Sequence, residues 1–239
     1  MELAIDTSTN MAGVALSEKG NVLIDITWRT EQNHTVELIP KIIYILQLQK
    51  ANIRDVKAIA VASGPGSFNG LRVGLGSAKG MAFALGIPLV AISTLEMIAF
   101  SHAESGLPVC SIVNAGRSAI AAALFQSCNG KWNRVVAEHI TTIEELCAEI
   151  KDQTVFCGEI SPEISMRLGQ KLGDKALFPE ESAMPRRVGY LSGLGWRRIE
   201  ASDFDDIRAV QPLYLKRPAI TISKKRRHDA MSSMQPRGS

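Results

Sequence analysis

Three consecutive polar residues near the start of the chain, Asp6, Thr7 and Ser8, have side chains suited to contacting phosphate groups. They follow a short apolar run and begin a hydroxyl-rich turn. A nucleotide-dependent kinase needs such a turn, with a carboxylate near the transferred phosphoryl group. A carboxylate here also caps a turn by accepting backbone N–H groups. Both interpretations of Asp6 stay open, and the three residues are candidate nucleotide contacts.

The rest of a kinase site is incomplete. A kinase of this kind requires a carboxylate in a second phosphate turn, but the corresponding residue here is Asn114. It also requires a pair of glycines beside the adenosine, but the run Val155–Glu159 contains only one. Weak nucleotide binding is compatible with these residues, whereas phosphoryl transfer is not expected. A nucleotide-binding small-molecule kinase is the alternative function.

Metal and nucleophilic catalysis find no support in the residue spacing. His34 has Leu38 rather than a second histidine four residues later, so no helical histidine pair faces one metal ion. The serines near the centre of the chain lack the Gly-x-Ser-x-Gly pattern of a nucleophile elbow. We therefore expect no catalytic residue and no metal site, and interpret His34 as a capping or interface residue.

The run Ser63–Arg72 predicts a tight turn between a strand and a helix. It follows the apolar run Ala58–Ala62 and leads into the helical run Leu71–Leu85. Glycines permit positive φ and close backbone approach, and Ser67 or Asn69 can cap the helix. Such a turn can bind an anion, but the lysine of a phosphate loop is missing, so a packing role is favoured.

The predicted helix carries small residues at four-residue spacing, with Gly70, Gly74, Ala78 and Ala82 on one stripe. A second stripe contains Gly76, Gly80 and Ala84. Each interior glycine costs about 1 kcal/mol of helix stability, so a compensating close approach of another helix is expected. That helix lies either in the same domain or in a partner.

The neighbouring helix is predicted over 35–51, where apolar residues surround most of the circumference. A surface helix needs only one apolar stripe, so this one has a further face to bury. We expect the two helices to form half of a helical interface through His34, Leu38, Ile42, Gly70, Gly74, Ala78 and Ala82. Packing within one domain would account for the same residues.

Two similar groups of strands predict an internal duplication. Three strands joined by polar turns are expected within 3–28, and the same order recurs within 108–139. Two copies of a hairpin-led α/β unit make the two-lobed architecture of actin, sugar kinases and Hsp70 (the ASKHA fold). The predicted fold class is therefore α/β, with a duplicated ASKHA-like fold.

Several motifs together resemble the TsaB (YeaZ) family, up to about Arg217. The motifs are Ala4–Thr9, His34-Thr35, Gly64–Gly74 with its Gly-Pro-Gly-Ser-Phe sequence, Ile92–Leu95 and Gln211–Lys216. The resemblance implies a non-catalytic subunit of the bacterial machinery that installs threonylcarbamoyl on the tRNA adenosine beside the anticodon.

The resemblance also implies partners. Family members bind the catalytic TsaD subunit and the ATPase TsaE, and form homodimers, through helices of the N-terminal lobe. It implies that tRNA is met mainly through the complex, with ATP or ADP a candidate ligand at the complex interface. The chain departs from the family at Asn114, where members usually carry Asp, which puts any charge-based role of that turn in doubt.

The length and composition of the chain predict two lobes followed by a basic C-terminal segment. The 239 residues, 46% of them hydrophobic, fit two lobes, predicted over 1–105 and 106–218, with a late helix that could pack back on the first lobe. Basic residues concentrate after residue 219, which predicts a basic, disordered tail over 219–239.

The four cysteines show no Cys-x-x-Cys pair, which favours reduced thiols and a cytoplasmic location. Residues 80–95 are uncharged but contain Gly86-Ile87-Pro88, and they are too short for a membrane span. No membrane contact is expected.

Overall fold

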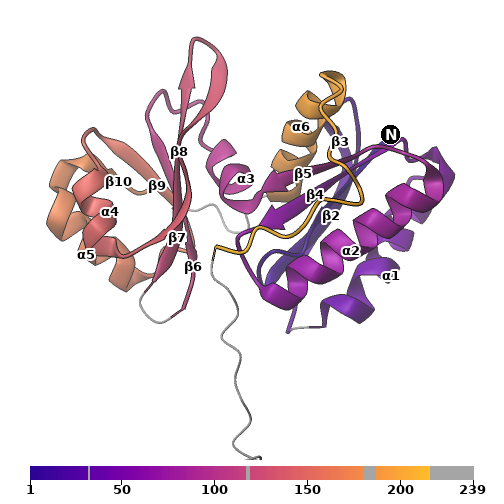
Figure 1. The fold of residues 1–239 in the computed structure, drawn as a ribbon, viewed down its shortest axis with the longest axis horizontal. Coiled ribbons are helices and arrows are strands. Elements are labelled where there is room, and N and C mark those ends of the chain that lie inside the picture. Colours follow the sequence, from indigo (N-terminus) through magenta and orange to yellow (C-terminus); the bar gives the residue numbers. More distant parts are fainter. Residues whose placement is uncertain (32, 117–118, 180–186, 216–239) are drawn as a thin grey trace, which may run out of the picture.

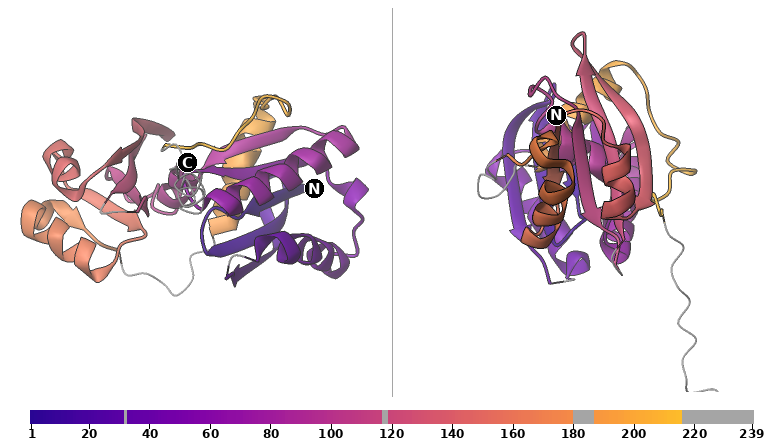
Figure 2. Two further views of the ribbon diagram at one scale, coloured as in Figure 1. Left: turned by 60° about the horizontal axis from the view of Figure 1, so that its bottom comes forward. Right: turned by 90° about the vertical axis from the view of Figure 1, so that its left-hand side faces the viewer.

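The computed structural model describes residues 1–31, 33–116, 119–179 and 187–215. It contains two five-stranded sheets that lie side by side along the longest axis of the molecule, each covered by helices (Figure 1 and Figure 2). This is the predicted two-lobed α/β fold. The predicted tail over 219–239 falls outside the described residues, and the predicted domain limits at 105 and 218 stay predictions.

The first lobe contains a mixed sheet with strand order β3-β2-β1-β4-β5. Strands β1 and β2, and β2 and β3, pair antiparallel, whereas β1–β4 and β4–β5 pair parallel. Its elements are β1 (Glu2–Asp6), β2 (Met11–Glu18), β3 (Asn21–Arg29), α1 (His34–Leu48), η1 (Ile53–Asp55), β4 (Ala58–Gly64), α2 (Phe68–Leu85), β5 (Leu89–Ser93) and α3 (Thr94–Phe100).

The second lobe repeats this topology and confirms the duplication. Read from β8, its strand order is β8-β7-β6-β9-β10, with the same two antiparallel and two parallel pairings. Its elements are β6 (Val109–Asn114), β7 (Ile120–Cys128), β8 (Lys131–Thr141), α4 (Ile143–Glu149), β9 (Thr154–Gly158), α5 (Pro162–Leu172), η2 (Gly173–Lys175) and β10 (Ala176–Leu177).

Alternation along the strands gives each sheet two buried faces. In β1, Leu3 and Ile5 point to α1 and α2, whereas Ala4 points to the opposite face, against α6 (Arg187–Glu200). The second sheet packs one face on α3 and the other on α4 and α5. Helices α3 and α6 therefore lie between the two sheets, as Figure 1 shows for α3.

The last helix, α6, returns from the second half of the chain to the first sheet. The strand face that it covers is made of small residues such as Ala4, Ala15 and Ala60, which permit a close approach. Gly195 of α6 has no room for a side chain, since an added Cβ would lie 2.5 Å from the Ala60 Cβ. Sequence-distant segments are thus interlocked in the first lobe.

The strand-to-helix turn forms as the sequence predicts. Helix α2 begins at Phe68, where the Ser67 side chain accepts a hydrogen bond from the Gly70 N–H, and it ends at Gly86 in the left-handed conformation. The Ser67 N–H donates to the Ser8 carbonyl at 2.7 Å, which ties this turn to the turn after β1. The backbones are so close that a Cβ at Gly66 would overlap the Ser8 carbonyl oxygen.

The segment after α6, residues 203–215, forms a strap across the first lobe toward the second; it is the gold trace of Figure 1. The Asp205 N–H donates to the Leu89 carbonyl, and its carboxylate accepts from the Ala91 N–H, so the strap covers the edge of β5. Lys79 of α2 donates to the Val210 carbonyl at 2.9 Å, and the Leu213 N–H donates to the Ser63 carbonyl at 2.7 Å. These contacts fix the path of the strap without regular secondary structure.

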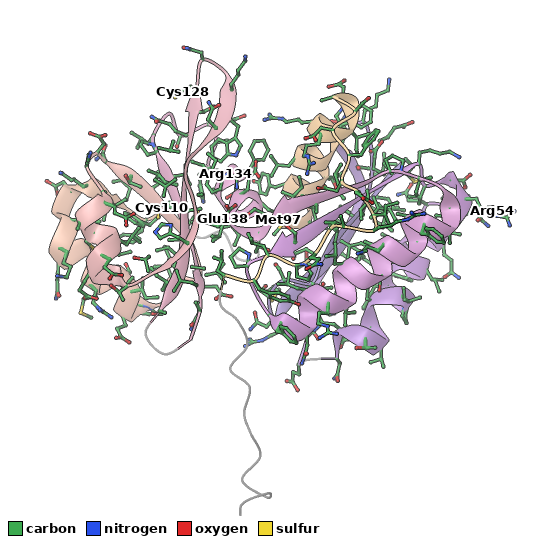
Figure 3. All side chains as sticks on the ribbon, viewed as in Figure 1. Arg54, Met97, Cys110, Cys128, Arg134 and Glu138 are labelled. Carbon is green, nitrogen blue, oxygen red and sulfur yellow. The ribbon has the colours of Figure 1, made fainter. Side chains whose placement is uncertain are left out.

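A charged cluster lies where the lobes meet. Glu138 of β8 accepts a hydrogen bond from Arg134 at 2.7 Å, and both lie in the junction near Met97 of α3 (Figure 3). Glu96 of α3 is the second carboxylate of this cluster. Burial raises the pKa of Glu96, and the nearby Glu138 raises it further against the opposing charges of Arg134 and Arg198.

Glu96→Gln is expected to increase the free energy of unfolding at about pH 7.5. The raised folded-state pKa means that the native protein binds the proton more tightly than the unfolded chain does, so Glu96 costs stability above the ordinary glutamate pKa. The gain should shrink as the pH falls toward that ordinary value, about 4.3. Urea unfolding of both proteins at several pH values measures it; a gain that grows on acidification would contradict the assignment.

The cysteines are unpaired in the described residues. Cys110 and Cys157 are buried, as expected for strand positions, whereas Cys147 is half-buried and Cys128 is exposed at the tip of the β7–β8 hairpin (Figure 3). None of the helices in the described ranges is long and apolar enough to cross a membrane.

Candidate partner-binding surface

The turn after β1 directs its polar groups into the protein. Asp6 is buried, and its Oδ1 accepts hydrogen bonds from the Ser8 N–H at 2.9 Å and the Ser8 hydroxyl at 2.6 Å. The Thr7 hydroxyl donates to the Gly70 carbonyl at 2.8 Å. These bonds are those of a turn cap, which the sequence left as one of two interpretations. Nucleotide contact by Asp6, Thr7 and Ser8 stays a prediction.

His34 joins three segments at the start of α1. It is 4% exposed, and its Nε2 lies 3.2 Å from the Thr9 carbonyl oxygen. A Cβ at Gly70 would come within 3.2 Å of the same nitrogen and would overlap the Thr7 carbonyl oxygen. His34 and Gly70 thus hold α1 and α2 against the turn after β1.

The seven residues chosen from the sequence as interface contacts are all buried within the first lobe. Leu38, Ile42, Ala78 and Ala82 belong to the core between the helices and the sheet. Gly74 is buried against Thr7, and His34 and Gly70 pack as described above. The small stripe therefore brings α2 close to its own sheet. An interface on these two helices stays a prediction, and it must use their other faces.

The opposite faces of α1 and α2 form what we call the outer helix face. Its α1 side chains recur at helical spacing and are 42–69% exposed, which is unusual for large apolar groups. Its α2 part contains the second glycine stripe, where a Cβ at Gly76 or Gly80 would meet nothing within 4 Å. The face consists of Val36, Ile39, Ile43, Tyr44 and Leu48 of α1, and Gly76, Gly80, Phe83 and Ala84 of α2.

Two features of the sequence point to the outer helix face: the second glycine stripe of α2 and the additional apolar face of α1. The second glycine stripe costs helix stability in the same way as the first, yet the structure offers it no internal neighbour. Because α1 is apolar on both faces, spacing alone does not show which face meets the sheet. Figure 1 shows α1 and α2 side by side on one face of the first sheet, which makes their outer surfaces continuous.

A cavity of about 190 Å³ lies between the lobes beside the Ser63–Arg72 turn. Pro65 and Gly66 form the first-lobe wall, Asn114 and Ala115 belong to the second-lobe wall, and the strap residues Leu213–Leu215 lie along it. The Asn114 N–H donates to Glu159 at 2.9 Å, and its side-chain oxygen accepts from the Gly116 N–H at 2.7 Å. Asn114 thus caps its own turn, as an aspartate would.

Within the described ranges, no group of three or more His, Cys, Asp or Glu side chains could hold a metal ion.

Comparisons with known proteins agree with this architecture. The model of the family described as "TsaD: tRNA N6-adenosine threonylcarbamoyltransferase" matches residues 28–172, which is more than half of the chain. The structure of YeaZ from Pseudomonas aeruginosa superposes with a TM-score of 0.75 at 23% identity, over 90% of this chain and 99% of that one. This structural likeness shows the fold.

Curated relatives from several bacteria carry the name "tRNA threonylcarbamoyladenosine biosynthesis protein TsaB". The Bacillus subtilis protein is 28% identical over 217 residues, which is 90% of this chain and 93% of its own length. The Escherichia coli protein is 37% identical over 97 residues, which is 41% of this chain and 42% of its own length. Because that family model covers more than half of the chain, the chain belongs to the family described as "TsaD: tRNA N6-adenosine threonylcarbamoyltransferase", and its curated relatives and its fold are those of the TsaB (YeaZ) proteins.

Proposed function

We propose that this chain takes part in tRNA threonylcarbamoyladenosine biosynthesis as a non-catalytic subunit that binds and organises a TsaD-like catalytic subunit. The exposed apolar stripe of α1 is the observation that carries this proposal. A monomer gains nothing from leaving five large apolar side chains in water on one helix face, whereas a partner would bury them. The assignment to tRNA threonylcarbamoyladenosine biosynthesis comes from the names of the relatives.

The shape of the outer helix face is also suited to binding a helix of a partner. The α1 side chains supply apolar area, and Gly76 and Gly80 leave a shallow track into which a partner helix can fit. The polar turn residues are used internally: Asp6 caps Ser8, and Thr7 binds Gly70. This arrangement supports a structural role for the turn and favours the subunit over the small-molecule kinase.

A homodimer would use the same outer helix face, so the homodimer and the TsaD-like complex are proposed to exclude one another. A TsaE-like ATPase is proposed to bind the assembled complex, with ATP or ADP at its interface and tRNA met mainly through the complex. The cytoplasm is the proposed location. A specific, stable interface buries about 800 Å² per partner, and we propose that both helices contribute to it.

The test is co-purification with a TsaD-like subunit, followed by a reconstituted tRNA modification assay with and without this chain. Modification is expected to depend on the chain. Val36→Asp should abolish co-purification, because it places a charge in the outer helix face. Val135→Asp is the matched control, since Val135 is an equally large, 54% exposed apolar residue on β8 of the second lobe. Full modification without the chain would refute the proposed function.

A further inference from the structure

A cluster of exposed side chains, two aromatic rings and one guanidinium, lies at the rim of the inter-lobe cavity. The rings of Phe68, from α2, and Tyr214, from the strap, lie 5.1 Å apart at an interplanar angle of 32°. The Arg72 guanidinium lies 5.2 Å from the centre of the Phe68 ring. Phe68 and Tyr214 line the cavity, yet each remains about 40% exposed. We call these three residues the aromatic rim.

Exposed aromatic rings beside a guanidinium have the composition of a site that binds unpaired nucleotides. Bases of single-stranded RNA stack on aromatic side chains and on Arg planes, while cations accompany the phosphates. Asn114, on the opposite wall of the cavity, has a side-chain amide whose N–H groups can pair with a base edge.

The charged groups beside the cavity favour one orientation of a bound nucleotide. Arg72 is exposed on the α2 side of the rim, whereas the Glu159 carboxylate lies 2.9 Å from the Asn114 N–H on the second-lobe side. A phosphate is attracted to the first side and repelled from the second.

The size of the cavity favours one base of a polymer over a free nucleotide. Pockets that enclose small molecules and cofactors usually measure about 300–1,000 Å³. This cavity, at about 190 Å³, is below that range, so it can take one flat ring while the sugar and phosphates stay outside.

We propose that the aromatic rim and the adjoining inter-lobe cavity bind one unpaired nucleotide of RNA, with its base stacked on Phe68 and Tyr214 and its phosphate near Arg72. This inference rests on the proposed function, because that function brings an RNA to the complex. It adds a direct base contact by this chain, in the lobe junction and away from the outer helix face.

The test uses the full chain and two labelled RNAs of equal length: a stem–loop with an unpaired loop, and a blunt duplex. The wild type should bind the stem–loop more tightly. Tyr214→Leu and Phe68→Leu keep apolar packing but remove a stacking ring, and each should weaken stem–loop binding about 5- to 150-fold. Tyr214→Trp should preserve binding. Arg72→Glu should weaken it and lower its salt dependence.

Matched controls separate stacking from general effects. Phe204→Leu changes another exposed strap phenylalanine, 47% exposed, and Arg54→Glu changes an exposed arginine at the far end of the first lobe (Figure 3). Both should bind the stem–loop as the wild type does. Equal affinity for stem–loop and duplex, or unchanged binding by Tyr214→Leu, would overturn the inference. So would displacement of the stem–loop by ATP at micromolar concentration, because the site would then be a free-nucleotide site.

Co-purification with the TsaD-like subunit is measured on the same variants. Tyr214→Leu should bind the stem–loop more weakly, as above, and should keep the partner at wild-type strength. A wild-type chain that captures the partner but shows no preference for unpaired RNA would end the RNA inference and leave the proposed function standing.

Discussion

Adjacent residues of α1 should respond in opposite ways to the same substitution. Ile42→Glu is expected to lower the free energy of unfolding by more than about 4 kcal/mol, because Ile42 is 2% exposed and an unpaired charge would enter the core. Ile43→Glu should change it by less than about 0.5 kcal/mol, because Ile43 is 49% exposed. The same Ile43→Glu protein should lose at least about 30-fold in affinity for the TsaD-like partner, the effect of removing a hot spot.

Chemical denaturation and a partner-binding titration measure both effects, and sedimentation shows whether the homodimer disappears with the partner complex. Ile42→Glu and Ile43→Glu serve as controls for each other, since both introduce the same charge on the same helix. If Ile43→Glu folds well, dimerises and binds the partner like the wild type, the outer helix face is not the interface. The second lobe would then have to be searched for it.

The fold was predictable because its hairpins carry local signals. Lys19 and Gly20 between β2 and β3, and Asn129 and Gly130 between β7 and β8, all have positive φ. Two-residue turns with positive φ match the twist of antiparallel strands, and glycine and asparagine tolerate them. With alternating apolar residues on each side, these turns predicted two equivalent strand groups and hence the duplicated architecture.

The orientation of α1 was not predictable from its sequence. Leu38 and Ile42 face the sheet, while Ile39 and Ile43 face outward, although the two pairs are chemically alike. Periodicity shows that a helix has apolar faces, but only the packed structure shows which face is covered. The missing information was long-range: His34 contacts Thr9, which fixes the rotation of α1 against the sheet.

The strap was also beyond the reach of local patterns. It was recognised only as the motif Gln211–Lys216, and it has no helix or strand period. Its position depends on hydrogen bonds to distant residues, such as Leu213 to Ser63 and Asp205 to Leu89. The same contacts bring Tyr214 beside Phe68, so the aromatic rim could not be predicted from spacing either.

Replacing two glycines of α2, Gly74 and Gly80, with alanine should change the stability of the protein in opposite directions. Gly74→Ala is expected to destabilise the protein by more than about 2 kcal/mol, although alanine is the better helix former. An added Cβ would overlap the Thr7 hydroxyl, whose hydrogen bond to the Gly70 carbonyl is buried. Either Thr7 moves and leaves these polar groups unpaired, or α2 moves away from the sheet, and both outcomes cost free energy.

Gly80→Ala should instead stabilise the protein by about 0.5–1 kcal/mol, because nothing lies within 4 Å of its added Cβ and the helix gains a better residue. Gly80→Leu should also fold, but it would fill the track on the outer helix face and weaken partner binding about 5- to 150-fold, an overpacking cost of 1–3 kcal/mol. Thermal unfolding and partner titration of the three variants check this order. A stable Gly74→Ala protein would show that Thr7 can give way, and a Gly80→Leu protein with full partner affinity would place the interface away from α2.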